Sequence, residues 1–593
     1  MSVSLRDVLT VAGVAAVLFF TNLGGYPLFD EDEPKNAVCG REMFERGDWI
    51  VPTFNDELRT DKPILIYWLM LCSFNVFGVS EFAARFGSSL LSVGTALGVY
   101  VIGRKLYDRQ VGLLAGVVVA TCLMFSAVGR AVTPDATLVC CLTWVFCGFV
   151  LSRDWRGQTS SGVSQEPERP HVWRFAARDW LFPYAMMGLA MLAKGPVGFL
   201  LPCTALGLYG LCSSTRDDLT AGRKTLTGAW WRQTVQLALL IASPTRFLRT
   251  LWGMKLWIGI PVAFGIALPW YIIVGWKTDG AWLAGFLGGH NVGRFLQPME
   301  QHHGPIIYYI PVLFAGTFPW SVFLPAAVAQ LWKRVKSRAE FSESDLFLAC
   351  WAATWLVFFS IARTKLPNYI LPIYPAVAVI IARSLVSWTC DDSQTARVFL
   401  LESRMLSAIG AAIIIGLLIA MTILMPRERF LALVGVIPIV TGGVAYWFAQ
   451  QDRRQAAVRS LAGGAAALCL CMIAAAPSRL ANYQDSPYFA NAARSATPEG
   501  TAEIASFEVF EPSLVYYLGH RVHRPNQPAD IAQFFSDHPQ GFLLIPANKL
   551  DRLPEDLAAQ LSEVTRQRRF LRRYDLVLLG QGSQLAARQE TVR

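Results

Sequence analysis

The sequence predicts a polytopic α-helical membrane protein that ends in a small α/β domain. Of its 593 residues, 53% are hydrophobic and only 16% are charged, with a mean hydropathy of +0.38. Typical soluble domains carry roughly 25% charged residues. The apolar residues form blocks long enough to cross a ~30 Å hydrocarbon core, which takes about 20 residues each. After residue 476 the composition becomes that of an ordinary soluble protein.

The block lengths predict about thirteen membrane-spanning helices. We expect them near residues 7–24, 81–103, 110–128, 135–152, 179–194, 197–213, 257–275, 306–328, 345–362, 369–386, 404–425, 431–449 and 459–476. The shorter apolar segments 64–78 and 234–243 are interpreted as interfacial or re-entrant helices. The first block lacks a basic flank and a small-residue cleavage site, so we interpret it as a retained span and not as a signal peptide.

The net charge of +10 does not indicate nucleic-acid binding, because the Lys and Arg residues lie in short clusters between apolar blocks. Basic loops mark the cytoplasmic side of membrane proteins. This rule predicts a cytoplasmic N-terminus and an extracytoplasmic C-terminal domain. It also places the segments 25–63, 129–134, 276–305 and 363–368 together outside the cytoplasm.

Two domains are therefore expected. Residues 1–476 form the membrane domain, which includes the polar loop 25–63, and residues 477–593 form the α/β domain. Within the second domain, strand-like runs at 503–507, 541–545 and 574–579 alternate with helical patterns at 511–518 and 528–537.

The first polar loop opens with four consecutive acids, Asp30 to Glu33, followed by Pro34 and Lys35. A solvated acidic cap on a helix end is one interpretation. The other is a general base or a metal site at the membrane surface, because Asp30 and Asp32 have the spacing of a DxD motif. That motif alone is a weak signal.

Two further acids lie at predicted helix starts. Asp61 and Lys62 precede Pro63 and the apolar segment that contains Tyr67, and Asp135 follows Thr133 and Pro134. Helix capping explains both acids without any function. Catalysis is the alternative, because both segments are expected on the same face of the membrane.

Lys194 lies in an apolar surrounding, which costs roughly 2.5–3.5 kcal/mol on insertion scales unless it faces a cavity or a partner. Snorkelling to the interface is the alternative. Lys62, Arg294 and Lys365 also lie at span ends on the outer side, where basic residues are scarce. Together they indicate an anionic ligand such as a lipid phosphate. The pair His302–His303 suits a metal poorly, since adjacent side chains point in different directions.

Several segments together resemble the bacterial aminoarabinose transferases that modify lipid A, and more broadly the dolichyl-phosphate-mannose protein mannosyltransferase-like superfamily. They are Asp32–Glu33, Arg41 to Met43, Gly47 to Pro52, Asp61 to Pro63, Tyr67–Trp68, Lys194 to Pro196, His290 to Phe295, Pro319 to Ser321, Lys365 to Pro367 and Tyr369 to Pro372. Lys35 stands where the aminoarabinose transferases typically have an arginine, so the resemblance leaves the sugar and the acceptor open.

The resemblance implies a C-type glycosyltransferase fold in the bacterial inner membrane. The enzyme would move a sugar from a polyprenyl (undecaprenyl) phosphate to a lipid A-like, glycan or protein acceptor on the periplasmic face, with inversion. It assigns catalysis to Asp32, Glu33 and Asp135. It assigns donor and substrate binding to Lys35, Asp61, Lys62, Tyr67, Lys194, His290, Arg294, Lys365 and Tyr369.

No cofactor is expected to be required, because lysine and arginine side chains can neutralise the departing phosphate. A divalent metal held by Asp30 and Asp32 is the alternative. The expected partners are the lipid-linked donor, the acceptor and membrane lipids, without nucleic acid. Two other functions stay open: a protein O-mannosyltransferase-like enzyme, and a non-enzymatic transporter of lipid-linked sugars. A transporter usually has repeated halves and midplane charges, which this sequence lacks.

Overall fold

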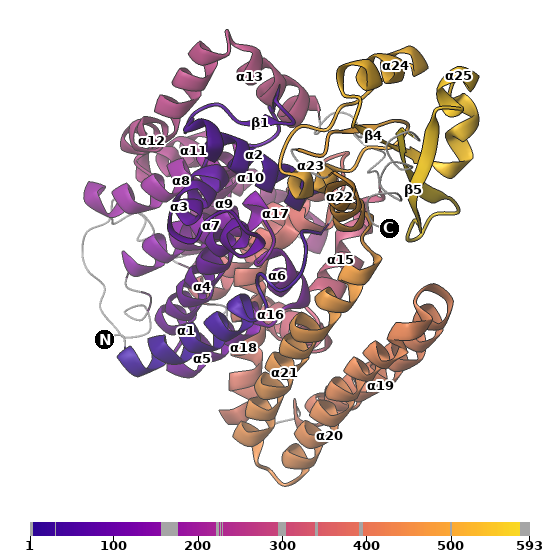
Figure 1. Ribbon diagram of the computed structural model, residues 1–593. Coiled ribbons are helices and arrows are strands. Elements are labelled where there is room, and N and C mark those ends of the chain that lie inside the picture. Colours follow the sequence, from indigo (N-terminus) through magenta and orange to yellow (C-terminus); the bar gives the residue numbers. More distant parts are fainter. Residues whose placement is uncertain are drawn as a thin grey trace.

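The computed structural model describes residues 4–29, 31–153, 155, 176–220, 224–225, 227, 229–293, 304–337, 342–390, 395–497 and 501–581 (Figure 1). Within these ranges, nine helices are long and apolar enough to cross a membrane. They are α4 (Glu81–Leu106), α7 (Pro134–Leu151), α9 (Val197–Thr220), α12 (Leu256–Lys277), α17 (Glu343–Ile361), α18 (Tyr374–Cys390), α19 (Thr395–Leu424), α20 (Val436–Gln450) and α21 (Arg454–Leu480). Helices α18 and α20 reach this length together with the 3₁₀ turn before them, as Pro367–Cys390 and Pro426–Gln450. The fold is that of a polytopic helical membrane protein, as predicted.

The predicted count of thirteen spans is not confirmed. Three of the expected spans are short helices, α1 (Leu5–Phe20), α5 (Arg109–Ala120) and α8 (Leu181–Lys194). At a rise of 1.5 Å per residue, the 16 residues of α1 extend about 24 Å, which is less than a ~30 Å hydrocarbon core. The span expected near 306–328 is broken. Its halves Ile306–Gly316 and Trp320–Val335, which contain α15 (Tyr309–Gly316) and most of α16 (Leu324–Ser337), meet at a bend of 116°.

The remaining helices of the membrane part are short. They are α3 (Leu65–Phe77), α6 (Leu123–Val128), α10 (Trp230–Ile241), α11 (Pro244–Gly253) and α13 (Ala281–Leu283), which leads into a π-helical segment at Ala284–Gly293. The 3₁₀ turns Ala177–Trp180, Ile306–Tyr308, Trp320–Phe323, Pro367–Ile373, Pro426–Gly435 and Ala481–Tyr483 lead into or follow other helices.

Helices α4 and α5 pack closely because a glycine lies where they cross. Asp108 caps α5 by accepting hydrogen bonds from the backbone N–H groups of Gln110 and Val111 (2.7 and 2.9 Å). A Cβ at Gly112 would lie 2.6 Å from the carbonyl oxygen of Tyr100 on α4. A side chain at this position would therefore push the two helices apart.

The polar loop after α1 is ordered and small. It contains α2 (Asp32–Arg46) and a two-stranded hairpin of β1 (Thr53–Phe54) and β2 (Glu57–Leu58). In Figure 1 this loop lies beside the yellow and gold C-terminal domain, at one end of the bundle.

The C-terminal domain has a four-stranded sheet in the order β3-β4-β6-β5. The elements are α22 (Asp485–Ala496), β3 (Ile504–Ser506), α23 (Pro512–Leu518), α24 (Pro528–Asp537), β4 (Phe542–Pro546), a 3₁₀ turn (Ala547–Arg552), α25 (Glu555–Ala558), β5 (Leu561–Arg568) and β6 (Asp575–Gln581). Strands β3 and β4 are parallel, whereas β4–β6 and β5–β6 are antiparallel. Three strands and two helices match the predicted segments; β5 was not predicted. Helix α21 runs across the predicted boundary at residue 476, so that boundary stays a prediction.

The sheet is covered on both faces. On β4, Leu543 and Ile545 pack with α24, while Phe542 and Leu544 join a core that also contains residues of α2, α3, α22 and α23. Side chains alternate along a strand, so one strand serves both cores. The C-terminal domain therefore shares a hydrophobic core with the first polar loop.

Candidate active site

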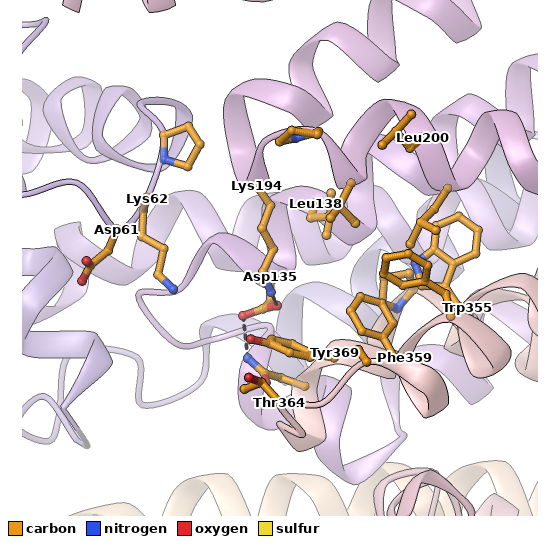
Figure 2. A pocket seen from close by; sticks show the side chains of 18 of the residues that line it. Asp61, Lys62, Asp135, Leu138, Lys194, Leu200, Trp355, Phe359, Thr364 and Tyr369 are labelled. Atoms are coloured by element: carbon orange, nitrogen blue, oxygen red, sulfur yellow. Dashed lines mark hydrogen bonds and ion pairs between the residues drawn. The ribbon is translucent and has the colours of Figure 1, made fainter. Parts of the chain in front are cut away.

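A cavity of about 440 Å³ lies between the start of α3, the start of α7, the α8–α9 junction and the turn after α17. Figure 2 shows Asp61, Lys62, Lys194 and Asp135 toward one end, with Tyr369 beside Asp135, and Trp355 and Phe359 toward the other. We call this space the first cavity. Its lining includes Asp61, Lys62, Asp135, Lys194, Asn368 and Tyr369.

The polar centre of the first cavity is the carboxylate of Asp135. Its Oδ1 accepts a hydrogen bond from Lys194 Nζ at 2.5 Å, and its Oδ2 accepts one from Asn368 Nδ2 at 2.9 Å. Asp135 is buried, whereas the Lys194 side chain keeps 20% of its surface exposed. The Lys194 ammonium also lies 5.0 Å from the centre of the Tyr369 ring. Three segments far apart in the sequence therefore meet at one carboxylate.

Local sequence explains these positions. Thr133 is extended and Pro134 occupies the first turn of α7, which places Asp135 where a helix favours negative charge. Lys194 is the last residue of α8, and the N–H of Gly195 closes that helix on the Met191 carbonyl at 2.8 Å. Gly195 has φ +76°, a conformation that glycine adopts without strain. The helix therefore ends at the lysine and delivers it to the cavity.

Asp61 and Lys62 enter from the loop before α3. Figure 2 shows the Lys62 side chain pointing between Asp61 and Asp135. The Asp61 carboxylate lies 3.5 Å from Arg59 Nε, and Arg59 is buried. Arg59 is further held by a hydrogen bond from its Nη2 to Asn36 Oδ1 at 3.1 Å. One end of the cavity thus carries Lys62 and Lys194 beside two carboxylates.

The rest of the lining of the first cavity is largely apolar. The apolar side chains include Leu138, Val197, Leu200, Leu201, Phe286, Trp355, Phe358, Phe359 and Ala362. A cavity with cations at one end and hydrocarbon along the rest suits a long amphiphile with an anionic head group.

A second cavity of about 580 Å³ contains Asp32, the exposed first residue of α2. Its walls come from α6 and the turn after it, from Leu366 to Asn368, and from the end of α21. Met472, Ile473, Ala476 and Leu480 make the α21 side apolar. Asn368 lines both cavities, so the two spaces meet at the residue that binds Asp135.

Glu33 lies beside Asp32, but its carboxylate is already engaged. It accepts hydrogen bonds from Arg85 Nε and Nη2 (3.0 and 2.9 Å), from Val132 N (3.0 Å) and from Phe29 N (2.8 Å). Arg85 is fully buried and also donates to the carbonyls of Leu23, Tyr26 and Pro27. This arrangement favours a structural role for Glu33 and argues against the catalytic role expected from the resemblance.

Three other expected binding residues lie away from the lining of the first cavity. Lys35 forms an ion pair with Glu31 at 3.0 Å on the surface of α2. Tyr67 is fully buried in α3. The Lys365 ammonium donates to the carbonyls of Phe359 and Ser360 (2.8 and 2.6 Å) at the end of α17, and burial lowers its pKa. Lys365 therefore positions the turn that carries Asn368 and Tyr369.

Part of the expected site lies outside the described residues. These are Asp30, Arg294 and the pair His302–His303, together with the side chain of His290, whose backbone belongs to the π-helical segment. Among the residues that the structure describes, no three metal-ligating side chains converge at either cavity.

Sequence reasoning missed two residues of this arrangement, Asn368 and Arg59. Asn368 lies in the Lys365 to Tyr369 motif that carried the resemblance, but no chemistry singled out its amide. Arg59 precedes Asp61 by two residues, and this spacing is the only signal that points to it.

The chain is similar in sequence to known membrane glycosyltransferases. Residues 61–162 match the family described as dolichyl-phosphate-mannose–protein mannosyltransferase. The undecaprenyl phosphate-alpha-4-amino-4-deoxy-L-arabinose arabinosyl transferase of Erwinia tasmaniensis is 30% identical over 356 residues, which is 60% of this chain and 55% of the relative. The protein of the same description from Serratia proteamaculans is 27% identical and covers 77% of this chain and 74% of the relative. The chain thus spans little more than half the length of the first curated relative.

The fold has a close structural counterpart. The crystal structure of ArnT from Cupriavidus metallidurans bound to undecaprenyl phosphate superposes with a TM-score of 0.72 at 20% identity, covering 98% of this chain and 99% of the other. Its apo form gives a TM-score of 0.71. The resemblance inferred from the sequence is confirmed: this chain is similar to the aminoarabinose transferases and, over residues 61–162, to the dolichyl-phosphate-mannose–protein mannosyltransferase family.

Proposed function

We propose that this chain is an inverting membrane glycosyltransferase that uses a polyprenyl (undecaprenyl) phosphate sugar as donor. The reaction takes place on the periplasmic face of the bacterial inner membrane, and the C-terminal domain lies on that side. The first cavity carries this proposal, because it joins two lysines at one end to an apolar wall. The transferase activity for which the relatives are named supports it.

The donor occupies the first cavity with its phosphate at Lys62 and Lys194 and its hydrocarbon chain along Leu200, Trp355 and Phe359. Asp135 and Asn368 orient Lys194. Charge-assisted hydrogen bonds to a partly desolvated phosphate are about twice as strong as neutral ones. The lysines therefore stabilise the charge that develops on the phosphate as it leaves.

The acceptor occupies the second cavity, where Asp32 acts as the general base. Asp32 takes the proton from an acceptor hydroxyl, or orients an acceptor phosphate. The acceptor oxygen attacks the anomeric carbon, the bond from that carbon to the phosphate oxygen breaks, and polyprenyl phosphate departs. The apolar α21 side of this cavity favours a lipid acceptor such as lipid A over a peptide.

The test is a transfer assay with purified protein in detergent, combined with mass spectrometry of envelope lipids and proteins from cells with and without this chain. We expect a sugar-modified product and free polyprenyl phosphate with the wild type. Asp32→Asn abolishes both and keeps donor binding. Glu31→Gln is the matched control, because it removes the neighbouring exposed carboxylate, and its rate stays within about twofold of wild type.

Wild-type protein that moves the donor across liposomes but releases no polyprenyl phosphate is a transporter, and this result contradicts the proposal. Near-normal turnover by Asp32→Asn contradicts the assignment of the base. The initial rate is expected to be insensitive to EDTA, since the lysines supply the positive charge. EDTA inhibition reversed by Mg²⁺, with Lys194→Ala still active, would instead make the acidic cluster a metal site.

A further inference from the structure

The C-terminal domain contains a cluster of metal-ligating side chains that the proposed transfer does not use. Three of the seven histidines of the chain lie between positions 520 and 538. Two of them, His523 and His538, meet Glu503, and one ligand atom from each of the three residues lies within 4.8 Å of the others. None of the three lines either cavity.

Backbone hydrogen bonds hold all three residues in place. The His523 N–H donates to the Ile504 carbonyl, and the Ser506 N–H donates to the His523 carbonyl, both at 2.9 Å. Through these two bonds His523 pairs with β3 at the edge of the sheet. Glu503 directly precedes β3 in the sequence. The Glu503 carbonyl in turn accepts from the N–H of Phe542 at 2.9 Å.

His538 ends α24. Its N–H donates to the Phe534 carbonyl, and its carbonyl accepts from the Gly541 N–H, both at 2.8 Å. The Phe534 ring lies 5.1 Å from the ring of His523 and 5.2 Å from that of His538, while the two imidazoles lie 4.9 Å apart. The ligands therefore come from separate segments whose relative positions are already set.

The distances suit a first-row transition metal. Zn²⁺ binds histidine nitrogen and carboxylate oxygen at about 2.0–2.2 Å in tetrahedral geometry, which places neighbouring ligand atoms about 3.4 Å apart. His523 Nε2 lies 3.5 Å from Glu503 Oε2. The ligand nitrogen of His538 lies within 4.8 Å of the other two ligand atoms, so rotation of the His538 side chain alone brings it to the same metal ion. The side chains of Glu503 and His523 are 26% and 31% exposed, so an ion can enter from solvent.

The donor set selects the kind of metal. Two imidazoles and one carboxylate suit Zn²⁺ and its neighbours, whereas Mg²⁺ and Ca²⁺ prefer oxygen ligands throughout. A water molecule or His520, whose Nδ1 lies 3.9 Å from Glu503 Oε2, supplies the fourth ligand. A simple Glu503–His523 ion pair needs only one imidazole, and it leaves unexplained why a second and a third histidine surround the same carboxylate.

We propose that Glu503, His523 and His538 form a Zn²⁺-type metal site that ties the edge of β3 to the end of α24. The site is structural and independent of sugar transfer.

The test uses full-length protein purified in detergent and stripped with a chelator, titrated with Co²⁺ alone. Tetrahedral Co²⁺ gives strong visible absorption bands that Zn²⁺ removes when it displaces the cobalt. We expect wild type and His171→Ala, which removes a histidine elsewhere in the sequence, to develop the same bands. His523→Ala and His538→Ala lose them, and Glu503→Gln weakens Co²⁺ binding by at least about tenfold.

Wild type without bands, or bands that persist in the His523→Ala/His538→Ala double variant, overturn the proposal. If the histidine variants do not fold, thermal unfolding decides: Zn²⁺ raises the Tm of the wild type but not that of Glu503→Gln. Equal shifts in both proteins, or no shift in the wild type, refute the site. Because these measurements involve no sugar donor, their outcome is separate from that of the transfer assay.

Discussion

Glu33 and Asp135 are both buried carboxylates beside the same turn, residues 129–134, yet their surroundings differ. Glu33 accepts four hydrogen bonds from an arginine that is itself fully buried and from backbone N–H groups. Asp135 accepts two, both from side chains that line a cavity. Burial and charge pairing alone therefore do not identify a site. Glu33 also borders the second cavity, but its arginine partner does not, whereas Lys194 and Asn368 both line the first cavity, where a ligand can reach them.

The largest effect is expected for Arg85, because its side chain is fully buried whereas that of Lys194 is 20% exposed. Arg85→Met leaves the Glu33 carboxylate buried without its main partner, which costs about 3–5 kcal/mol. We expect loss of the monodisperse peak in detergent size-exclusion chromatography. Lys194→Met, which breaks the pair beside the first cavity, should stay monodisperse. An Arg85→Met protein as well folded as Lys194→Met would remove the distinction between the two regions.

Lys194→Ala should act on binding and not on folding. A desolvated charge-assisted contact to phosphate is worth about 2 kcal/mol, or ~30-fold in affinity. The measurement is binding of undecaprenyl phosphate to the purified variant. Lys277→Ala serves as control, because Lys277 is 44% exposed and pairs with Asp48 outside both cavities. Equal losses in the two variants would mean that the first cavity does not hold the phosphate.

Asn368→Ala tests the other partner of Asp135, because it removes only the hydrogen bond from a neutral amide to the carboxylate. Hydrogen bonds to a charged group contribute about 1.5 kcal/mol or more, so we expect roughly a tenfold slower transfer with little change in thermal unfolding. Asn368→Ser, which keeps a donor of shorter reach, should recover part of the rate. A rate unchanged in Asn368→Ala would show that Lys194 alone orients the carboxylate.

The smallest effect concerns Asp485, a third buried carboxylate, at the start of α22 in the C-terminal domain. Its Oδ1 lacks a hydrogen-bond partner among the described residues, and Arg569 approaches the carboxylate only to 3.9 Å. Burial and the nearby Glu511 raise its pKa to about 7. The folded state therefore keeps a proton that the unfolded state releases above its usual pKa near 3.8.

This contribution to stability falls as the pH rises through about 7. Thermal unfolding should shift down by a few degrees between pH 5 and pH 8, and Asp485→Asn should flatten the shift. A pH dependence that is unchanged in Asp485→Asn would assign it to another group.

Much of this arrangement could be predicted from sequence because it depends on local signals. Apolar block length located the nine long helices, and short strand-like runs located three of the four strands of the C-terminal sheet. Strand β5 escaped because its sequence, Leu561 to Arg568, is largely polar and only partly buried. The short helices α1, α5 and α8 were counted as full spans because hydropathy does not reveal where a helix ends.

The residues of the candidate site were predicted only in part. Asp61, Lys62, Asp135, Lys194 and Tyr369 do come together at one cavity. Glu33 and Lys365 looked equally suitable in the sequence, because a charged residue at a span end looks the same whether it faces a ligand or a backbone carbonyl. Only the three-dimensional contacts separate the two cases, as the Arg85 and Phe359 partners show.

The contact between the first polar loop and the C-terminal domain has a consequence for protein engineering. Arg41 on α2 donates to the carbonyls of Tyr516 and Val515 (2.8 and 3.2 Å), and Asn55 exchanges two hydrogen bonds with the backbone of Val522 (3.0 and 2.8 Å). Chimeras with homologous chains should therefore exchange residues 25–63 and 477–593 as one module. A graft of either segment alone would place a foreign surface against the part of the loop that carries Asp32, the proposed general base.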